Sequence, residues 1–196
     1  MKRINPDKII VLDDIPQWMI AFGQDQFKQF RFSTHHYGDP ARPEDGWLFG
    51  GMLFDKYTHG MNWLRDAPNF AFTLNEYFMK HAVFTADKNA VIRNLIRVRV
   101  NGMNTSCFAG VHTDSSLPDH WAVLYYVTDS TGSTDIYDLD NSLVKSIEPK
   151  AGRMVMFPAG YPHKANPPSE NHQWRITLNY NYIIEGNLNK NLFVYS

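Results

Sequence analysis

The chain has 196 residues with a formal net charge of −1 at pH 7, and 14% of its residues are aromatic. This length is enough for one domain with a sizeable core. The near-neutral charge argues against a protein whose main task is to bind nucleic acid or an anionic membrane, because both reward a basic surface.

The cysteine content and the N-terminal segment bear on the cellular compartment. Cys107 is the only cysteine, which excludes an internal disulfide and a zinc site made of thiolates. Residues 1–14 contain four consecutive apolar residues between charged ones, too few for a signal-peptide core or a membrane span. No later apolar stretch is long enough to span a membrane, and we expect a soluble, cytoplasmic protein.

The first 85 residues carry mixed secondary-structure signals. Residues 8–12 predict a short strand. Apolar side chains at helical spacing predict helices over residues 15–30 and 69–84. The intervening segment 35–51 is rich in turn-forming residues and predicts a loop.

After residue 85 the pattern changes to short β-rich segments separated by turn residues. Eight such segments in about a hundred residues are typical of a sandwich or a jelly roll. We therefore expect a mainly β single domain over residues 1–196, with a helical and mixed extension over 1–85 packed on the outer sheet and a jelly-roll catalytic core over 86–196. The eight segments are residues 91–100, 106–112, 121–128, 134–139, 143–148, 153–157, 161–165 and 174–184.

His112 and Asp114, one residue apart, precede one of these apolar segments. The pair alone has little weight, because such pairs arise by chance and Asp114 also suits a turn cap. Two histidines and one carboxylate hold iron(II) by one face of its octahedron and leave three positions open. His163, which follows the turn at Pro158 and Gly160, supplies the third ligand from a distant strand. The alternative for His163 is a place on a surface loop.

Arg175 lies among apolar and aromatic residues in the last predicted strand. A charge there is costly unless it is paired, and the strand around it offers no acidic partner. A guanidinium suits the carboxylate of a ligand. Thr177 shares the strand face of Arg175, so its hydroxyl is placed to hold the same carboxylate. The alternative is a salt bridge to a remote acidic residue.

Together, His112-x-Asp114, His163 and Arg175-x-Thr177 resemble the motifs of the 2-oxoglutarate- and iron(II)-dependent oxygenases. The resemblance is greatest to the small branch that includes prolyl hydroxylases and related bacterial and phage enzymes. It implies that the two histidines and the aspartate bind Fe(II). It also implies that 2-oxoglutarate places its far carboxylate on Arg175 and Thr177, and that O2 is the oxidant.

The resemblance covers residues from about 92 to 184. It implies a double-stranded β-helix of eight strands, which agrees with the independent count of segments. The spacing of twelve residues between the distal histidine and Arg175 is slightly long for the prolyl hydroxylase pattern, in which the cation is often a lysine.

Two further positions match by the same resemblance. Relatives often carry a tyrosine in the strand after His-x-Asp that touches 2-oxoglutarate, and Tyr126 fits, with Tyr125 facing the other way. Some relatives place an asparagine on the preceding strand as a co-substrate ligand. Asn101 fits this place, and Asn104 is the alternative.

Arginines alternate with apolar residues in segment 91–100. Arg97 and Arg99 share one strand face, which we expect to be an outer, solvated one. The alternative is a docking face for an acidic substrate.

The resemblance implies hydroxylation of an unactivated C–H bond, because halogenases of the family replace the carboxylate that Asp114 provides. A cupin-like metal jelly roll is disfavoured, because cupins usually show His-x-His with a following glutamate. A non-catalytic interaction domain is disfavoured because all three ligands and Arg175 are present. The expected substrate is a peptide or protein side chain, with prolyl hydroxylation as the nearest analogue. A small free amino acid or metabolite is the alternative.

Overall fold

The computed structural model describes residues 3–28, 30, 33–36, 46–56, 69–79, 91–171 and 173–186. The N-terminal elements are a 3-10 turn at Pro6–Lys8, β1 (Ile10–Leu12), α1 (Gln17–Lys28), β2 (Ser33–His36), β3 (Gly46–Asp55) and α2 (Asn69–Tyr77). The later elements are β4 (Val91–Met103), β5 (Phe108–Ala109), β6 (His120–Tyr126), β7 (Thr134–Tyr137), β8 (Leu143–Ile147), β9 (Met154–Pro158), β10 (His163–Ala165) and β11 (Arg175–Glu185).

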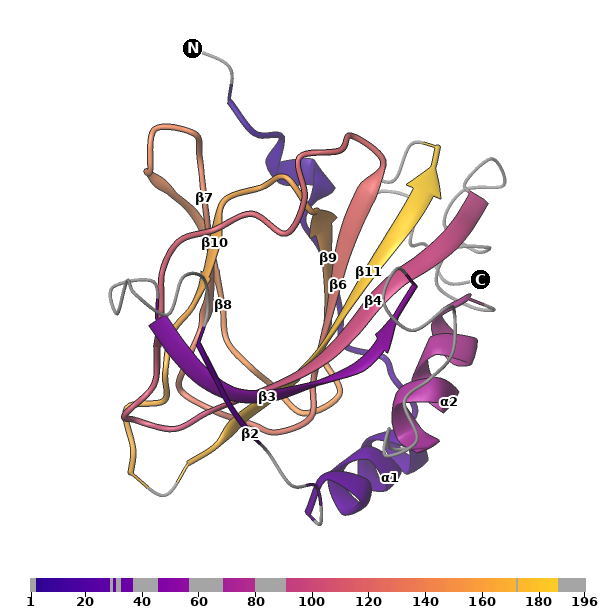
Figure 1. Cartoon of the computed structure of the whole chain (residues 1–196), viewed down its shortest axis with the longest axis vertical. Helices are drawn as coiled ribbons and strands as arrows, with labels where there is room; N and C mark the ends of the chain where they lie inside the picture. The colour runs from indigo at the N-terminus through magenta and orange to yellow at the C-terminus, as the bar shows by residue number, and fades with distance from the viewer. Residues whose placement is uncertain are drawn as a thin grey trace.

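Two antiparallel sheets face each other (Figure 1). The large sheet has the order β1-β9-β6-β11-β4-β3-β2, with β5 paired to β3, and the small sheet has the order β10-β7-β8. Each of the eight predicted segments after residue 85 overlaps one of the strands β4 to β11. The mainly β jelly-roll prediction is therefore confirmed.

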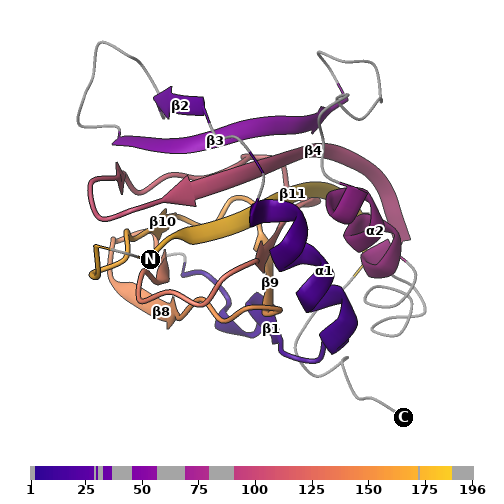
Figure 2. The same ribbon diagram turned by 90° about the horizontal axis from the view of Figure 1, so that it is seen from below.

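The helices α1 and α2 cover the face of the large sheet that points away from the small sheet (Figure 2). Their apolar side chains, among them Phe27, Phe70 and Leu74, form one core cluster with outward-facing residues of β4, β6 and β11. A second cluster fills the space between the sheets and includes Leu124 and Phe157. The large sheet is thus buried on both faces, which explains why β6 and β9 are almost continuously apolar in sequence.

The side chains of β6 point alternately into the two core clusters. Tyr125 belongs to the cluster under the helices, whereas Tyr126 belongs to the cluster between the sheets. The predicted opposite orientation of these two tyrosines is confirmed, and it follows from the two-residue period of a strand.

The predicted loop over residues 35–51 is wrong at both ends, because Ser33–His36 forms β2 and Gly46–Asp55 forms β3. Strand β3 pairs with both β4 and β5, so its backbone groups are satisfied despite three glycines. Residues 37–45 and 80–84 of the predicted loop and second helix lie outside the described residues.

No helix in the described part of the chain is both long and apolar enough to cross a membrane.

Phe70 provides a test of the packing between the helices and the sheet. Its side chain is 0% exposed, and its ring lies 5.7 Å from that of Phe22 and 5.3 Å from that of Tyr125. We expect Phe70→Ala to lower the free energy of unfolding by about 3–5 kcal/mol, because it leaves a cavity in the core. Urea denaturation measures this change.

The matched control is Phe72→Ala on the same helix, where the side chain is 49% exposed. We expect this variant to lose about 1 kcal/mol or less. Equal losses in the two variants would contradict the packing of α2 on the large sheet.

Candidate functional site

The predicted triad comes together at one edge of the space between the sheets. His112 and His163 form an isolated antiparallel bridge, in which each backbone N–H donates to the other residue's carbonyl at 2.9 and 2.8 Å. Their ring centroids are 4.4 Å apart. The backbone N–H of Asp114 donates to Ala159 at 2.9 Å, which ties this loop to the end of β9. One ligand atom from each triad residue lies within 4.8 Å of the others.

Both histidines are oriented by their own backbone. Nδ1 of His112 lies 3.1 Å from the carbonyl of Gly110, and Nδ1 of His163 lies 2.9 Å from the carbonyl of Tyr161. A carbonyl accepts only, so this geometry places the proton of a neutral ring on Nδ1. The Nε2 lone pair is then available to a metal, as in histidine–metal sites whose second nitrogen is held by a carbonyl.

Asp114 is held by side chains of two neighbouring strands. Its side chain is 2% exposed. Oδ2 accepts hydrogen bonds from Nδ2 of Asn179 at 3.1 Å and Nδ2 of Asn181 at 3.0 Å, while Oδ1 lies 3.5 Å from Nη2 of Arg97. Three donors from β4 and β11 therefore fix the carboxylate.

The protonation states suit metal binding. Burial is the largest influence on the pKa of Asp114 and would raise it. The two histidines when protonated, the guanidinium of Arg97 and the hydrogen bond from Asn181 outweigh burial, so the net effect lowers that pKa. Burial, followed by the neighbouring charge of His163, lowers the pKa of His112. The carboxyl group is therefore anionic and the His112 imidazole neutral near pH 7, which are the forms that bind a divalent metal.

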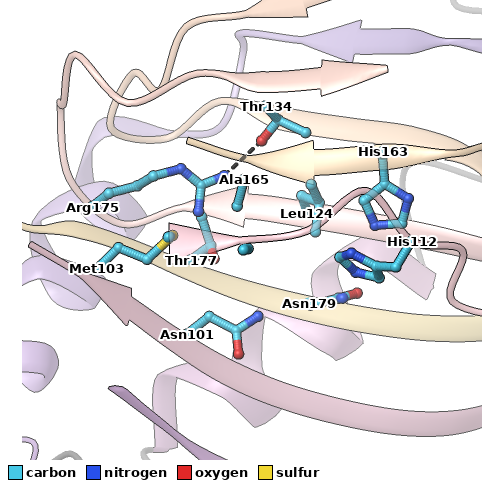
Figure 3. A pocket seen from close by; sticks show the side chains of 11 residues that line it. Asn101, Met103, His112, Leu124, Thr134, His163, Ala165, Arg175, Thr177 and Asn179 are labelled. Carbon is cyan, nitrogen blue, oxygen red and sulfur yellow. Dashed lines mark hydrogen bonds between the residues drawn. The ribbon is translucent and has the colours of Figure 1, made fainter. Parts of the chain in front are cut away.

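A cavity of about 420 Å³, including its open mouth, begins at the two histidines and runs between the sheets to Arg175 (Figure 3). Residues from both sheets line it: Asn101, Met103, Ala109, His112, Leu124, Thr134, His163, Ala165, Arg175, Thr177 and Asn179.

Arg175 closes the far end of the cavity, and its side chain is 2% exposed. Nε donates to the carbonyl of Gly132 at 2.9 Å, and Nη2 donates to Oγ1 of Thr134 at 2.6 Å. None of the acidic side chains that the structure describes pairs with it, so the alternative of a remote salt bridge is not found there. Burial lowers the pKa of this guanidinium. A buried cation without a counter-charge is costly, and a ligand carboxylate would supply the missing charge.

Of the other residues predicted to bind the co-substrate, two line the cavity and one does not. Thr177 and Asn101 stand opposite each other in the register of β11 and β4, and both line it. Tyr126 lies behind the wall: its ring is 5.5 Å from the Arg175 guanidinium carbon, and its hydroxyl donates to Thr134 at 2.7 Å. Asn104 instead accepts hydrogen bonds within its own turn.

Three residues around the triad were missed by the sequence analysis. Asn179 and Asn181 continue the face of β11 that begins with Arg175, so the alternation in RITLNYNY is the signal that would have identified them. Arg97 was expected on a solvated outer face, and this is wrong. It stands opposite Asn181 in the register, donates to its Oδ1 at 2.9 Å and reaches the buried carboxylate.

The residues present fit an iron and 2-oxoglutarate site on the chemistry of their donors. Two imidazole Nε2 atoms and one anionic carboxylate stand at one end of the cavity, and a buried guanidinium without a carboxylate partner stands at the other. Oδ1 of Asn179, which lines the cavity between them, is buried and has no hydrogen-bond partner. Buried polar atoms are rarely left so, and this one points to a ligand or water.

Comparison with known proteins agrees with this donor set. The model of the 2OG-Fe(II) oxygenase superfamily matches residues 98–182. This stretch contains the triad, Arg175, and two of the residues that hold Asp114, Asn179 and Asn181. Arg97, the third, lies one residue before the matched stretch. Among curated proteins, no sequence matches the chain.

Solved structures of such enzymes share the fold. A prolyl-4-hydroxylase from Pseudomonas putida is 11% identical with a TM-score of 0.60, over 92% of this chain and 94% of that one. A prolyl hydroxylase from Trichoplax adhaerens, in complex with a peptide of hypoxia-inducible factor, is 15% identical with a TM-score of 0.62, over 91% and 84%. The nogalamycin-biosynthesis epimerase SnoN, in complex with Fe3+, alpha-ketoglutarate and nogalamycin RO, is 11% identical with a TM-score of 0.62, over 90% and 79%.

Asn181 provides a test of the support around Asp114. We expect Asn181→Leu to weaken binding of Fe(II) by about 10- to 100-fold, as is typical when a residue that orients a metal ligand is lost. Anaerobic competition with a chromophoric chelator measures the affinity. Asn94→Leu places the same change on β4 outside this network and should bind iron like the wild type. Unchanged affinity in Asn181→Leu would show that the carboxylate needs no such support.

His112 predicts how stability depends on pH in the metal-free protein. Its folded-state pKa lies below the ordinary value of about 6.5, so folding favours the neutral ring. The stability is therefore complete above that value and falls as the pH decreases below it, where the unfolded chain binds the proton more readily. We expect the free energy of unfolding, measured with urea in the presence of EDTA, to fall from pH 7.5 to 5.5 more steeply in the wild type than in His112→Gln. Equal slopes would contradict the buried neutral imidazole.

Proposed function

We propose that this chain is a 2OG-Fe(II) oxygenase, which the family match over residues 98–182 supports, and that it hydroxylates an unactivated C–H bond of a peptide or protein side chain. The single observation that carries the proposal is the cavity with His112, His163 and the nearby Asp114 at one end and the unpaired Arg175 at the other. Such a cavity suits a reagent with a metal-chelating end and a distant carboxylate, which is the chemistry of 2-oxoglutarate.

In this proposal, His112 and His163 bind Fe(II) through Nε2, and Asp114 binds it through one carboxylate oxygen. The bound iron, with 2-oxoglutarate and O2 as co-substrates, supplies the oxidising power for C–H hydroxylation. Because Asp114 would supply the carboxylate that halogenases of the family replace, we infer hydroxylation and not halogenation.

The residues of the chain orient the reagents and keep water out. Arg175 and Thr177 would hold the far carboxylate of 2-oxoglutarate by charge and hydrogen bonds. Tyr126 supports this end, because its ring packs against the guanidinium and its hydroxyl shares Thr134 with it. Asn101, from the opposite strand of the cavity wall, is placed to hydrogen-bond the same co-substrate. A dry cavity makes each of these interactions stronger than it would be in water.

A peptide substrate is supported by prolyl hydroxylases among the similar structures, one of which holds a peptide. SnoN, which holds a small natural product, supports the alternative of a small metabolite. We also propose that residues 1–196 act as a single domain, because β1 pairs with β9 of the core and both N-terminal helices pack on the large sheet.

The test is an anaerobic titration with iron(II) and 2-oxoglutarate, followed by the weak visible charge-transfer band of the chelate. We expect the band in the wild type and its loss in His112→Ala. In Arg175→Lys, which keeps the charge but not the fork of donors, we expect about 10-fold or greater weakening of 2-oxoglutarate binding.

Arg93→Gln is the control, because Arg93 is exposed on β4 and pairs with Glu185. It should give the wild-type band and affinity. No band in the wild type at saturating iron(II) and 2-oxoglutarate would overturn the proposed function.

A further inference from the structure

We propose that Arg99 forms a binding site for a carboxylate of the substrate, so that this enzyme acts on a carboxylate-bearing molecule. The inference rests on the proposed function and names the substrate class of the same site. It is carried by the placement of Arg99 on β4, by its lack of a partner and by the charges around it.

Arg99 stands on the face of β4 that lines the site. In the register with β11, which runs without a shift from Arg97 to Met103, Arg99 lies opposite Asn179. Its neighbours two residues away on the same face are Arg97, which reaches the buried carboxylate, and Asn101, which lines the cavity. Two strand residues span about 7 Å, so the Arg99 side chain begins within one side-chain length of both.

The guanidinium of Arg99 is available to a ligand. Arg99 is half-buried, and no described residue accepts a hydrogen bond from it or forms an ion pair with it. Every other arginine in the described part of the chain has such a partner: Arg3, Arg93, Arg97, Arg153 and Arg175. Arg99 is thus the exception among these arginines, and a partly buried arginine without an acceptor is suited to binding an anion.

The formal charges of the loaded site favour an anionic substrate. Iron(II) and 2-oxoglutarate cancel each other, and Asp114 cancels Arg175. Asp55 of β3 stands opposite Arg97 in the strand register and offsets its charge, so Arg99 leaves one positive charge. A substrate carboxylate reduces this excess, whereas a neutral substrate leaves it in a poorly solvated cleft.

The substrate is the component that needs Arg99. The far carboxylate of 2-oxoglutarate has Arg175 as its partner, and its other end is neutralised by the metal. The carboxylate in question has two sources, the α-carboxylate of a free amino acid and an acidic side chain beside the oxidised residue of a peptide.

The experiment measures equilibrium binding by calorimetry to anaerobic enzyme loaded with iron(II) and 2-oxoglutarate. The first probe pair is L-proline and L-prolinamide, and the second is a capped tetrapeptide with proline beside aspartate and its asparagine analogue. We expect one carboxylate probe to bind the wild type at least about 10-fold more tightly than its amide. The pair that shows the preference identifies the source of the carboxylate.

In Arg99→Gln we expect this preference to fall to about onefold, with 2-oxoglutarate affinity unchanged within about a factor of two. Arg99→Lys should keep part of the preference, because it keeps the charge. Arg93→Gln, on the same strand but paired with Glu185 outside the site, should behave like the wild type.

Three results would overturn the inference: no preference for a carboxylate in the wild type, including no binding of any probe; a preference that survives Arg99→Gln; or a loss confined to 2-oxoglutarate binding in that variant. Failure of the wild type to bind 2-oxoglutarate would instead overturn the proposed function, so the two failures are distinguishable.

Discussion

An almost completely buried carboxylate, that of Asp114, is the constraint around which the site is organised. Removing a carboxylate from water is costly unless charges and hydrogen bonds replace the lost hydration. Here the replacement comes from Arg97 on β4 and from Asn179 and Asn181 on β11. The central strands of the large sheet must therefore lie side by side, in one register, before the carboxylate can be buried.

Strand β11 carries most of this organisation because its two faces have different tasks. Leu178, Tyr180 and Tyr182 face the helices and belong to the large core cluster. The alternate residues face the space between the sheets and place Arg175 at one end of the cavity and Asn181, which holds Asp114, near the other. A shift of the register by one residue would exchange the faces, bury the polar side chains under the helices and remove both ends of the site. Fold and site are thus specified by the same pairing.

Site residues could be predicted from the sequence where they act within a short motif. Those that act through the pairing of distant strands could not. His112, Asp114, His163 and Arg175 were identified because polar residues beside apolar strands are conspicuous and match a known spacing. The eight core strands were identified because turn residues separate them. The partners of Asp114 were not identified, because they come from two strands, β4 and β11, that are about 80 residues apart in sequence. Only the register of these strands brings them together. The orientation of Arg97 and the strand at residues 46–51 failed for the same reason, because a neighbouring strand decided each of them.

The far end of the cavity couples the free energy of unfolding to the concentration of a ligand. Arg175 is satisfied by a carbonyl and a hydroxyl, neither of which carries a negative charge. A ligand that brings a carboxylate to it binds the folded chain and not the unfolded one, so the ligand's concentration adds to the free energy of unfolding by mass action. The free energy of unfolding is therefore expected to increase with the concentration of such a ligand.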